Sequence, residues 1–330
     1  MIHAGGTNYH AIIALILHRR PLMQMTLASS PSGVNMTGTD SIFRTNGADP
    51  VYCAIKDEIN PRCQEAKIFV EDLWGKTYEY LDSDILKEIP VQFHQRFWEI
   101  YLAASLVKAG LNLQHSSGRD GPDLCIKADN GSKVWIEAVT ATPGQGNDAV
   151  QKSELGTVND VPDDQIKLRL LNAFAEKNKK YNHYRTKNWV SSEEPYVIAI
   201  NAAQVPSARL EREIPRIIRS LLPFGFQVVH LSRETLEVAK TSHEYQGEVI
   251  KSSGTEIETT SFLNPEYAGI SAVIYSCADA FNYPAEISKE LLLFHNPLAT
   301  NPLLFGFLRK GCEYWVDKQR LTSKNWNQEE

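Results

Sequence analysis

Two acidic residues on either side of a turn are the first candidates for chemistry in this chain of 330 residues. Asp123 precedes the apolar run 124–128, and Glu137 lies within the apolar run 134–140. The residues between the runs, Asp129-Asn130-Gly131, are typical of a tight turn. Two apolar runs joined in this way predict a β-hairpin that carries one acid on each strand.

The length of the loop decides whether the two acids meet. With a three-residue loop, Leu124 faces Ile136 on an apolar face, and the two acids face each other on the opposite side. A two-residue loop, Asn130-Gly131, would put the acids on opposite faces and pair Ile126 with Trp135. The apolar pattern favours the first register, which brings the two Cβ atoms within roughly 5 Å.

Two carboxylates at that distance repel each other, and burial adds a desolvation cost. The pair is tolerable if one acid is protonated, if both extend into water, or if a divalent cation lies between them. The third alternative is the functional one, because carboxylate oxygens on adjacent strands, completed by water and phosphate, are ligands that Mg²⁺ accepts. Paired acids at an exposed sheet edge are also common without any metal.

The segment resembles the core motif of the PD-(D/E)XK nuclease superfamily. Gly121-Pro122-Asp123 and Trp135-Ile136-Glu137-Ala138-Val139 match its two acidic motif positions. Glu99, in the preceding helical pattern, matches a further acid that this superfamily often supplies. The resemblance covers residues 93–202, about a third of the chain.

The resemblance implies a restriction-endonuclease-like α/β core, with a central mixed sheet flanked by helices. It implies an endonuclease that hydrolyses phosphodiester bonds, with DNA as the expected substrate and Mg²⁺ or Mn²⁺ as the cofactor. Asp123, Glu137 and the backbone carbonyl of Ala138 would hold the metal, and Glu99 would reach it directly or through water. A homodimer is an option, since double-strand cutters of this type often need two active sites.

One motif position departs from the superfamily, because Val139 stands where a lysine is usual. That lysine is thought to position the attacking water and to stabilise charge on the phosphate. The next helical segment offers Lys167, Arg169 and Lys177, and the last two share a face across Ala173. We expect Lys177 to be the replacement, with Arg169 second. If neither reaches the acids, the chain would be an inactive module that binds nucleic acid or protein.

Residues 165–190 carry a surplus of six positive charges in a chain whose net charge is −6. The net charge excludes a wholly basic nucleic-acid binder, but a local patch is enough for phosphate contacts. The aromatic side chains of Tyr181, Tyr184 and Trp189 could stack on bases. The expected contacts with nucleic acid come from Lys167, Lys179, Lys180, Tyr181, Arg185 and Lys187. An ordinary solvated helix surface would explain the same charges.

The acids must be positioned by helices and strands that the apolar pattern predicts around them. We expect helices over 91–108, 165–184 and 208–222, the last kinked or broken at Pro215. We expect strands over 124–128, 134–140, 195–200, 226–231, 270–275 and 291–294. This alternation predicts a mixed α/β fold around one central sheet.

Composition divides the chain unevenly. Residues 1–50, poor in large apolar side chains after Leu27, predict a flexible leader. Residues 51–330 are then expected to form one PD-(D/E)XK-like domain, with its core at about 91–235 and a C-terminal elaboration at 236–330. Five scattered cysteines exclude a disulfide scaffold and a zinc motif, and no apolar run near the start could span a bilayer. We therefore expect a cytoplasmic protein without a membrane partner.

Overall fold

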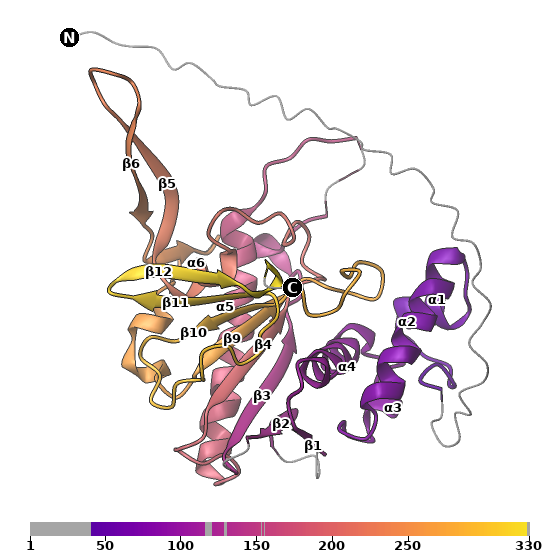
Figure 1. Ribbon diagram of the computed structural model, residues 1–330. Coiled ribbons are helices and arrows are strands. Elements are labelled where there is room, and N and C mark those ends of the chain that lie inside the picture. The colour runs from indigo at the N-terminus through magenta and orange to yellow at the C-terminus, as the bar shows by residue number, and fades with distance from the viewer. Residues whose placement is uncertain (1–40, 116–120, 129–130, 153, 155, 329–330) are drawn as a thin grey trace. The chain divides into compact units, whose positions relative to one another are not determined.

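The computed structural model describes residues 41–328, except 116–120, 129–130, 153 and 155 (Figure 1). The described residues belong to one compact unit. Most of the leader expected over 1–50 lies outside them. Its last ten residues are not a loose leader, because Ile42 and Phe43 are buried in the core and the Asp49 side chain caps the first helix. Burial of two large apolar side chains holds this segment in place.

A mixed sheet of eight strands forms the centre, in the order β1-β2-β3-β4-β9-β10-β11-β12. The sheet confirms the expected α/β class. β3 and β9 run parallel to β4 between them, and β10 runs parallel to β11, while the other neighbours are antiparallel. The strands are β1 (Leu113–Gln114), β2 (Leu124–Lys127), β3 (Lys133–Thr140), β4 (Tyr196–Asn201), β9 (Ala272–Ser276), β10 (Leu292–His295), β11 (Cys312–Asp317) and β12 (Arg320–Asn325).

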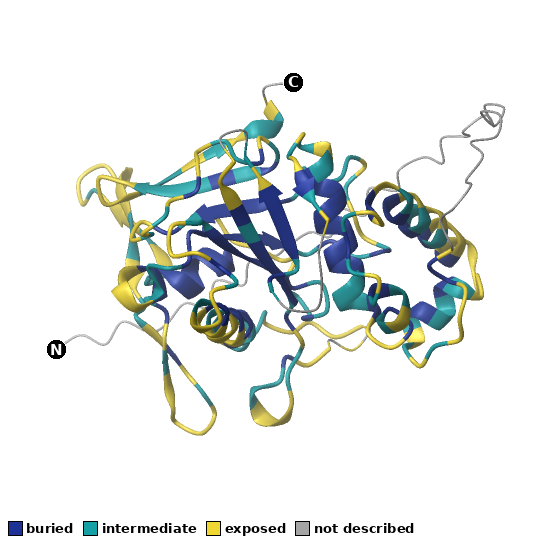
Figure 2. Cartoon of the chain, turned by 90° about the horizontal axis from the view of Figure 1, so that it is seen from below, coloured by how far each residue is buried: buried dark blue, intermediate teal, exposed yellow. Residues whose placement is uncertain are grey.

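Helices cover both faces of the sheet, and the inner strands are buried between them (Figure 2). Alternate residues of β4 enter the two cores, with Val197 and Ala199 on the side of α4 and Ile198 and Ile200 on the side of α5. The helices are α1 (Pro50–Lys56), α2 (Pro61–Thr77), α3 (Ile85–Glu88), α4 (Phe93–Lys108), α5 (Asp163–Thr186) and α6 (Arg216–Leu221). Short 3₁₀ turns lie at Gly146–Asp148, Ser261–Leu263, Pro265–Tyr267 and Trp326–Gln328. Among the helices of the described chain, none combines the length and apolar character needed to cross a bilayer.

The hairpin has the predicted register. Leu124 pairs with Ile136 and Ile126 pairs with Val134, and Gly131 has the positive φ (83°) that a left-handed turn position requires. Because β2 begins at Leu124, the carboxyl half of β3 extends beyond its neighbour. The structure thereby creates an open edge of β3 beside Asp123, where groups from both faces of the sheet can meet.

Two expectations about the elements around this core are wrong. The helix expected over 208–222 begins only at Arg216, because Pro215 has no backbone N–H to continue a helix through it. The strand expected over 226–231 forms, but outside the central sheet: β5 (Phe224–Leu231) pairs with β6 (Val238–Tyr245) as a separate ribbon. A second small ribbon consists of β7 (Glu248–Ile250) and β8 (Glu256–Glu258).

Candidate active site

Glu137 is a fully buried carboxylate surrounded by donors from α5. Lys177 Nζ lies 2.6 Å and Lys180 Nζ 2.9 Å from Glu137 Oε1, and the Tyr184 hydroxyl donates to Oε2 at 3.3 Å. The three donors recur at spacings of three and four residues, so they share one helix face. Lys177, which we expected to replace the lysine missing at Val139, therefore contacts one of the two acids directly.

The charge on Glu137 changes the acidity of its partners. Burial alone would lower the pKa of Lys180, but the charge and hydrogen bond of Glu137 outweigh it and raise that pKa. Burial, followed by the same carboxylate charge, raises the pKa of the Tyr184 hydroxyl. Both groups therefore stay protonated at neutral pH and remain hydrogen-bond donors to Glu137.

Asp123 is half-buried at the open edge of β3. Its Oδ2 atom accepts a hydrogen bond of 2.7 Å from the Ala138 backbone N–H, which β2 is too short to pair. Burial, and then the negative charges of Glu137 and Glu99, raise the pKa of Asp123 well above its usual value, while Lys177 opposes the shift. Asp123 thus lies near enough to Glu137 and Glu99 for both of their charges to act on it.

Glu99 reaches the same edge from α4, where it is buried and held by a cation. Arg96 Nη1 lies 2.6 Å from each Glu99 oxygen, and the Gln95 amide donates to Oε1 at 2.8 Å. Burial raises the pKa of Glu99, although the Arg96 charge and both hydrogen bonds oppose this. Arg96 also pairs with Glu88 of α3, so two acids share one guanidinium.

Gln95 connects α4 to the open edge of β3 and was missed by the sequence analysis. Its Oε1 atom accepts from the Thr140 backbone N–H at 2.9 Å, and its Nε2 donates to the Ala138 carbonyl at 3.3 Å. Gln95 and Glu99 are one helical turn apart, so the spacing was a usable signal. Arg96 was also missed, since its role depends on the contact between α3 and α4.

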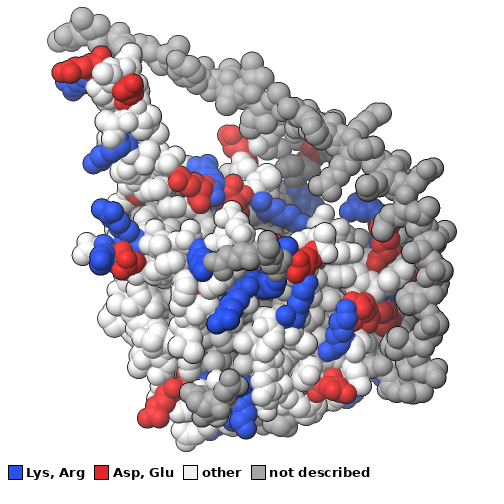
Figure 3. All heavy atoms as spheres, viewed as in Figure 1, with Lys and Arg blue, Asp and Glu red and all other residues white. Residues whose placement is uncertain are grey.

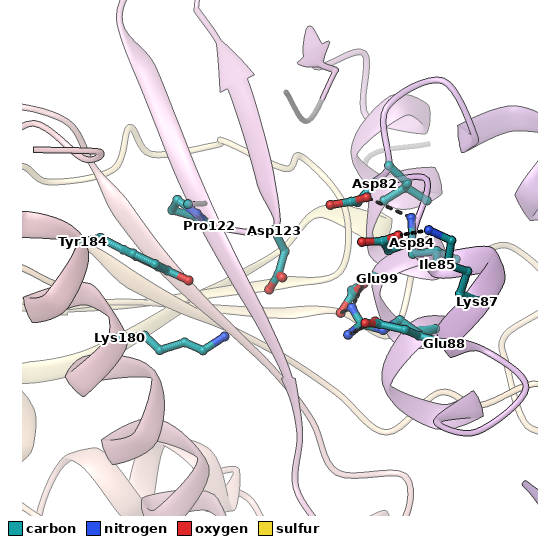
Figure 4. A pocket seen from close by; sticks show the side chains of 13 residues that line it. Asp82, Asp84, Ile85, Lys87, Glu88, Glu99, Pro122, Asp123, Lys180 and Tyr184 are labelled. Atoms are coloured by element: carbon teal, nitrogen blue, oxygen red, sulfur yellow. Dashed lines mark hydrogen bonds and ion pairs between the residues drawn. The ribbon is translucent and has the colours of Figure 1, made fainter. Parts of the chain in front are cut away.

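A pocket of about 420 Å³ opens beside Asp123 and Glu99, and Glu137 and Lys177 lie behind its lining (Figure 4). Figure 4 shows Asp123 between Glu99 on the α4 side and Lys180 with Tyr184 on the α5 side. The acidic residues in its lining are Asp82, Asp84, Glu88, Glu99 and Asp123, and the basic ones are Lys87, Arg96 and Lys180. The pocket therefore combines carboxylate oxygens with cations, of which Lys87 and Arg96 lie on α3 and α4 and Lys180 lies on α5.

The oxygen atoms at this edge suit a hard cation. Among the residues that the structure describes, no three His, Cys, Asp or Glu side chains are grouped to hold a metal ion. Mg²⁺, however, commonly takes only one or two carboxylates and keeps several waters. Asp123, Glu137 and the Ala138 carbonyl are donors of this kind, and a cation would relieve the repulsion that, after burial, raises the pKa of Asp123. This donor set fits Mg²⁺ or Mn²⁺.

Two basic residues expected at the site lie elsewhere. Lys167 is fully buried against Asp164 at 2.8 Å and the Gln246 side chain at 2.7 Å, so it offers no surface charge to nucleic acid. The Arg169 guanidinium lies against Gly144, where a Cβ would meet Nη1, and so it points to the loop after β3. Of the two cations expected at the acids, Lys177 and Arg169, Lys177 lies beside them and Arg169 does not.

The expected nucleic-acid surface is reduced by burial. Tyr181 is buried, with its ring centroid 4.7 Å from that of Tyr196, so it offers no free face for stacking. Arg185 is half-buried and donates to the Val190 carbonyl at 3.2 Å. Lys179 and Lys187 are exposed, and Lys180 is exposed although its ammonium pairs with Glu137.

Comparisons of the chain with protein-family models, with curated proteins and with solved structures found no match.

Proposed function

We propose that the chain is a metal-dependent nuclease with a restriction-endonuclease-like core. The observation that carries the proposal is the cluster of Asp123, Glu137 and Lys177 around the open edge of β3. The order α4, β2, β3, α5, β4 supports the fold assignment, because it places the two acids on the hairpin and the lysine on the following helix. Position 139 is valine, and the ammonium comes from Lys177 instead.

In this proposal Asp123, Glu137 and the Ala138 carbonyl hold Mg²⁺ or Mn²⁺, and Glu99 acts through water. The metal would supply a bound water of lowered pKa and polarise the phosphate. Lys177 stays beside Glu137 and offsets negative charge that develops on the phosphate. Lys180, whose side chain is 53% exposed, can turn from Glu137 toward the phosphate in the pocket.

The proposed substrate is DNA, and the proposed location of the protein is the cytoplasm. Lys179 and Lys187 would contact the phosphate backbone beside the pocket, so binding should weaken as salt rises. All five cysteines are free thiols, which is typical of a reducing compartment.

Cleavage of plasmid and single-stranded DNA with Mg²⁺, with Mn²⁺ and with EDTA tests the proposal. We expect cleavage with either metal and none with EDTA. Asp123→Asn and Glu137→Gln should each lower the rate at least 100-fold, and Lys177→Met by 10- to 100-fold. Glu176→Gln, which neutralises an exposed carboxylate on the same helix, is the matched control. Cleavage by the double variant D123N/E137Q at the wild-type rate would sink the site assignment.

A second candidate is an inactive module of the same fold that binds nucleic acid or protein. The observation in its favour is that Lys177, Lys180 and Tyr184 already satisfy Glu137, and Arg96 satisfies Glu99. It predicts salt-sensitive binding without turnover. Calorimetry that detects no heat for Mg²⁺ or Mn²⁺ in the wild type would favour this candidate over the nuclease.

A further inference from the structure

The ribbon of β5 and β6 extends away from the central sheet and exposes apolar side chains (Figure 1). Val229 is 50% exposed, Leu231 54%, Leu236 74% and Val238 62%. Leu231 and Val238 are paired across the ribbon, and Val229 lies two residues before Leu231, so all three share one face. This face, Val229, Leu231 and Val238 with Leu236 at the turn, is called the ribbon patch below.

Nothing within the described chain pairs with the outer edges of the ribbon, which remains two-stranded. Two-stranded ribbons are marginally stable alone in water, and unpaired edges readily accept another strand. Among the residues that the structure describes, the base of the ribbon is anchored: Phe224 packs on the core, and Arg212 lies 4.6 Å from the Phe226 ring centroid. The outer part of the ribbon therefore presents exposed apolar side chains and unpaired strand edges that a partner could cover.

The charge of the ribbon argues for a protein partner. Residues 224–245 contain Arg233 and Lys240 against Glu234, Glu237 and Glu244, so they carry no positive surplus. Figure 3 shows the ribbon as mostly uncharged, with the acidic and basic side chains mixed near its end. A nucleic-acid contact would need an excess of positive charge, which this segment lacks.

We infer that the ribbon patch binds the ribbon patch of a second copy of this chain. In a two-fold dimer the same surface meets itself, and an apolar patch without net charge can do so without repulsion. With Tyr245, which is 78% exposed, the patch would hide on the order of 500 Å² per copy, and two copies would reach about 1,000 Å², where specific interfaces begin. The inference does not depend on the nuclease proposal.

Light scattering coupled to size-exclusion chromatography, on the full chain from about 1 to 100 µM, tests the inference. We expect the wild type to have twice the chain mass at the upper concentrations. Leu231→Glu places a charge in the centre of the patch and should raise the dissociation constant at least 100-fold. His230→Glu is the matched control: it adds the same charge at the next residue, on the opposite face with Lys240.

Circular dichroism of both variants shows whether they are folded. A folded L231E monomer beside a dimeric H230E variant supports the inference. A wild type that is monomeric at 100 µM overturns it, whether the patch is then open or covered by another segment of the same chain. A dimer that L231E leaves unchanged overturns it as well. If L231E is unfolded, Val229→Glu takes its place with the same expected result.

Discussion

Glu137 and Lys177 are both removed from water, and this distinguishes them from the other ion pairs at the site. Glu137 is fully buried and the Lys177 side chain is 10% exposed, whereas Lys180 contacts the same carboxylate with a largely solvated side chain. A buried charge that loses its partner keeps its desolvation cost, whereas an exposed one is rehydrated. The two lysines should therefore differ strongly in what they contribute to stability.

We predict that Lys177→Met lowers the free energy of unfolding by about 3 kcal/mol, because it leaves Glu137 buried with one exposed ammonium. Lys180→Met should cost less than about 1 kcal/mol. Urea unfolding of both variants at pH 7, with EDTA present, gives the comparison. Equal losses for the two substitutions would contradict the assignment of Lys177 as the buried partner.

Gln95 links α4 to β3 through hydrogen bonds, and its side chain carries no charge. We predict that Gln95→Leu costs about 2 kcal/mol, since it leaves the Thr140 N–H and the Ala138 carbonyl without their partner. Hydrogen exchange at the Thr140 amide should become faster in this variant. Unchanged exchange at Thr140 would show that Gln95 does not cap the edge of β3.

At the scale of elements, α5 is attached to α6 through one carboxylate at its first residue. Asp163 Oδ1 lies 2.7 Å from Arg216 Nε, and Oδ2 lies 2.7 Å from Arg219 Nη1, and both arginines are buried. Burial opposes the charge of Asp163, but the two guanidinium groups outweigh it and hold its pKa far below the usual range. The ion pairs stabilise the fold whenever Asp163 is ionised.

We predict that Asp163→Asn lowers the free energy of unfolding by about 3 kcal/mol at pH 7, since two buried arginines lose their counter-charge. The depressed pKa means that this stability is present above the ordinary aspartate pKa of about 3.9 and is lost as pH falls below it. The difference between wild type and variant should therefore shrink in melts at pH 3. Asp160→Asn, in the exposed loop before α5, is the control. It should leave the free energy of unfolding unchanged at both pH values.

The hairpin and α5 could be predicted because their apolar residues follow the period of one element. Alternation fixes the register of Leu124 against Ile136, and helical spacing places Lys177 on an inward face. The break at Pro215 was predicted correctly, but the segment before it is not helical. Arg216 donates to the carbonyls of Ala208 and Leu210 and holds that segment in turns. Arg96 and Gln95 could not be assigned from sequence, because their partners lie on other elements.

At the scale of the molecule, the folded unit begins earlier than composition indicated. Ile42 and Phe43 pack with Tyr52 and Phe93 in the core below α4. Polar residues surround these two apolar side chains in sequence, so a compositional average hides them. A chain shortened past this point would lose part of the core that supports α4, and with it the position of Glu99.

We predict that a chain beginning at residue 50 is less stable than one beginning at residue 41 by about 3–6 kcal/mol, because two buried side chains are lost. Urea unfolding of the two truncated chains gives the difference directly. Equal midpoints and slopes would show that residues 42 and 43 do not belong to the core.

The hydrogen bond from the Ala138 amide to Asp123 has a practical consequence. An amide proton that donates to a carboxylate responds to the charge of that carboxylate, and on this edge of β3 the neighbouring strand β2 does not reach Ala138. One backbone resonance could therefore report events at Asp123 without a label at the site. Protonation, a bound cation and a bound phosphate would each displace this resonance by a different amount, so NMR titrations could distinguish them before any turnover is observed.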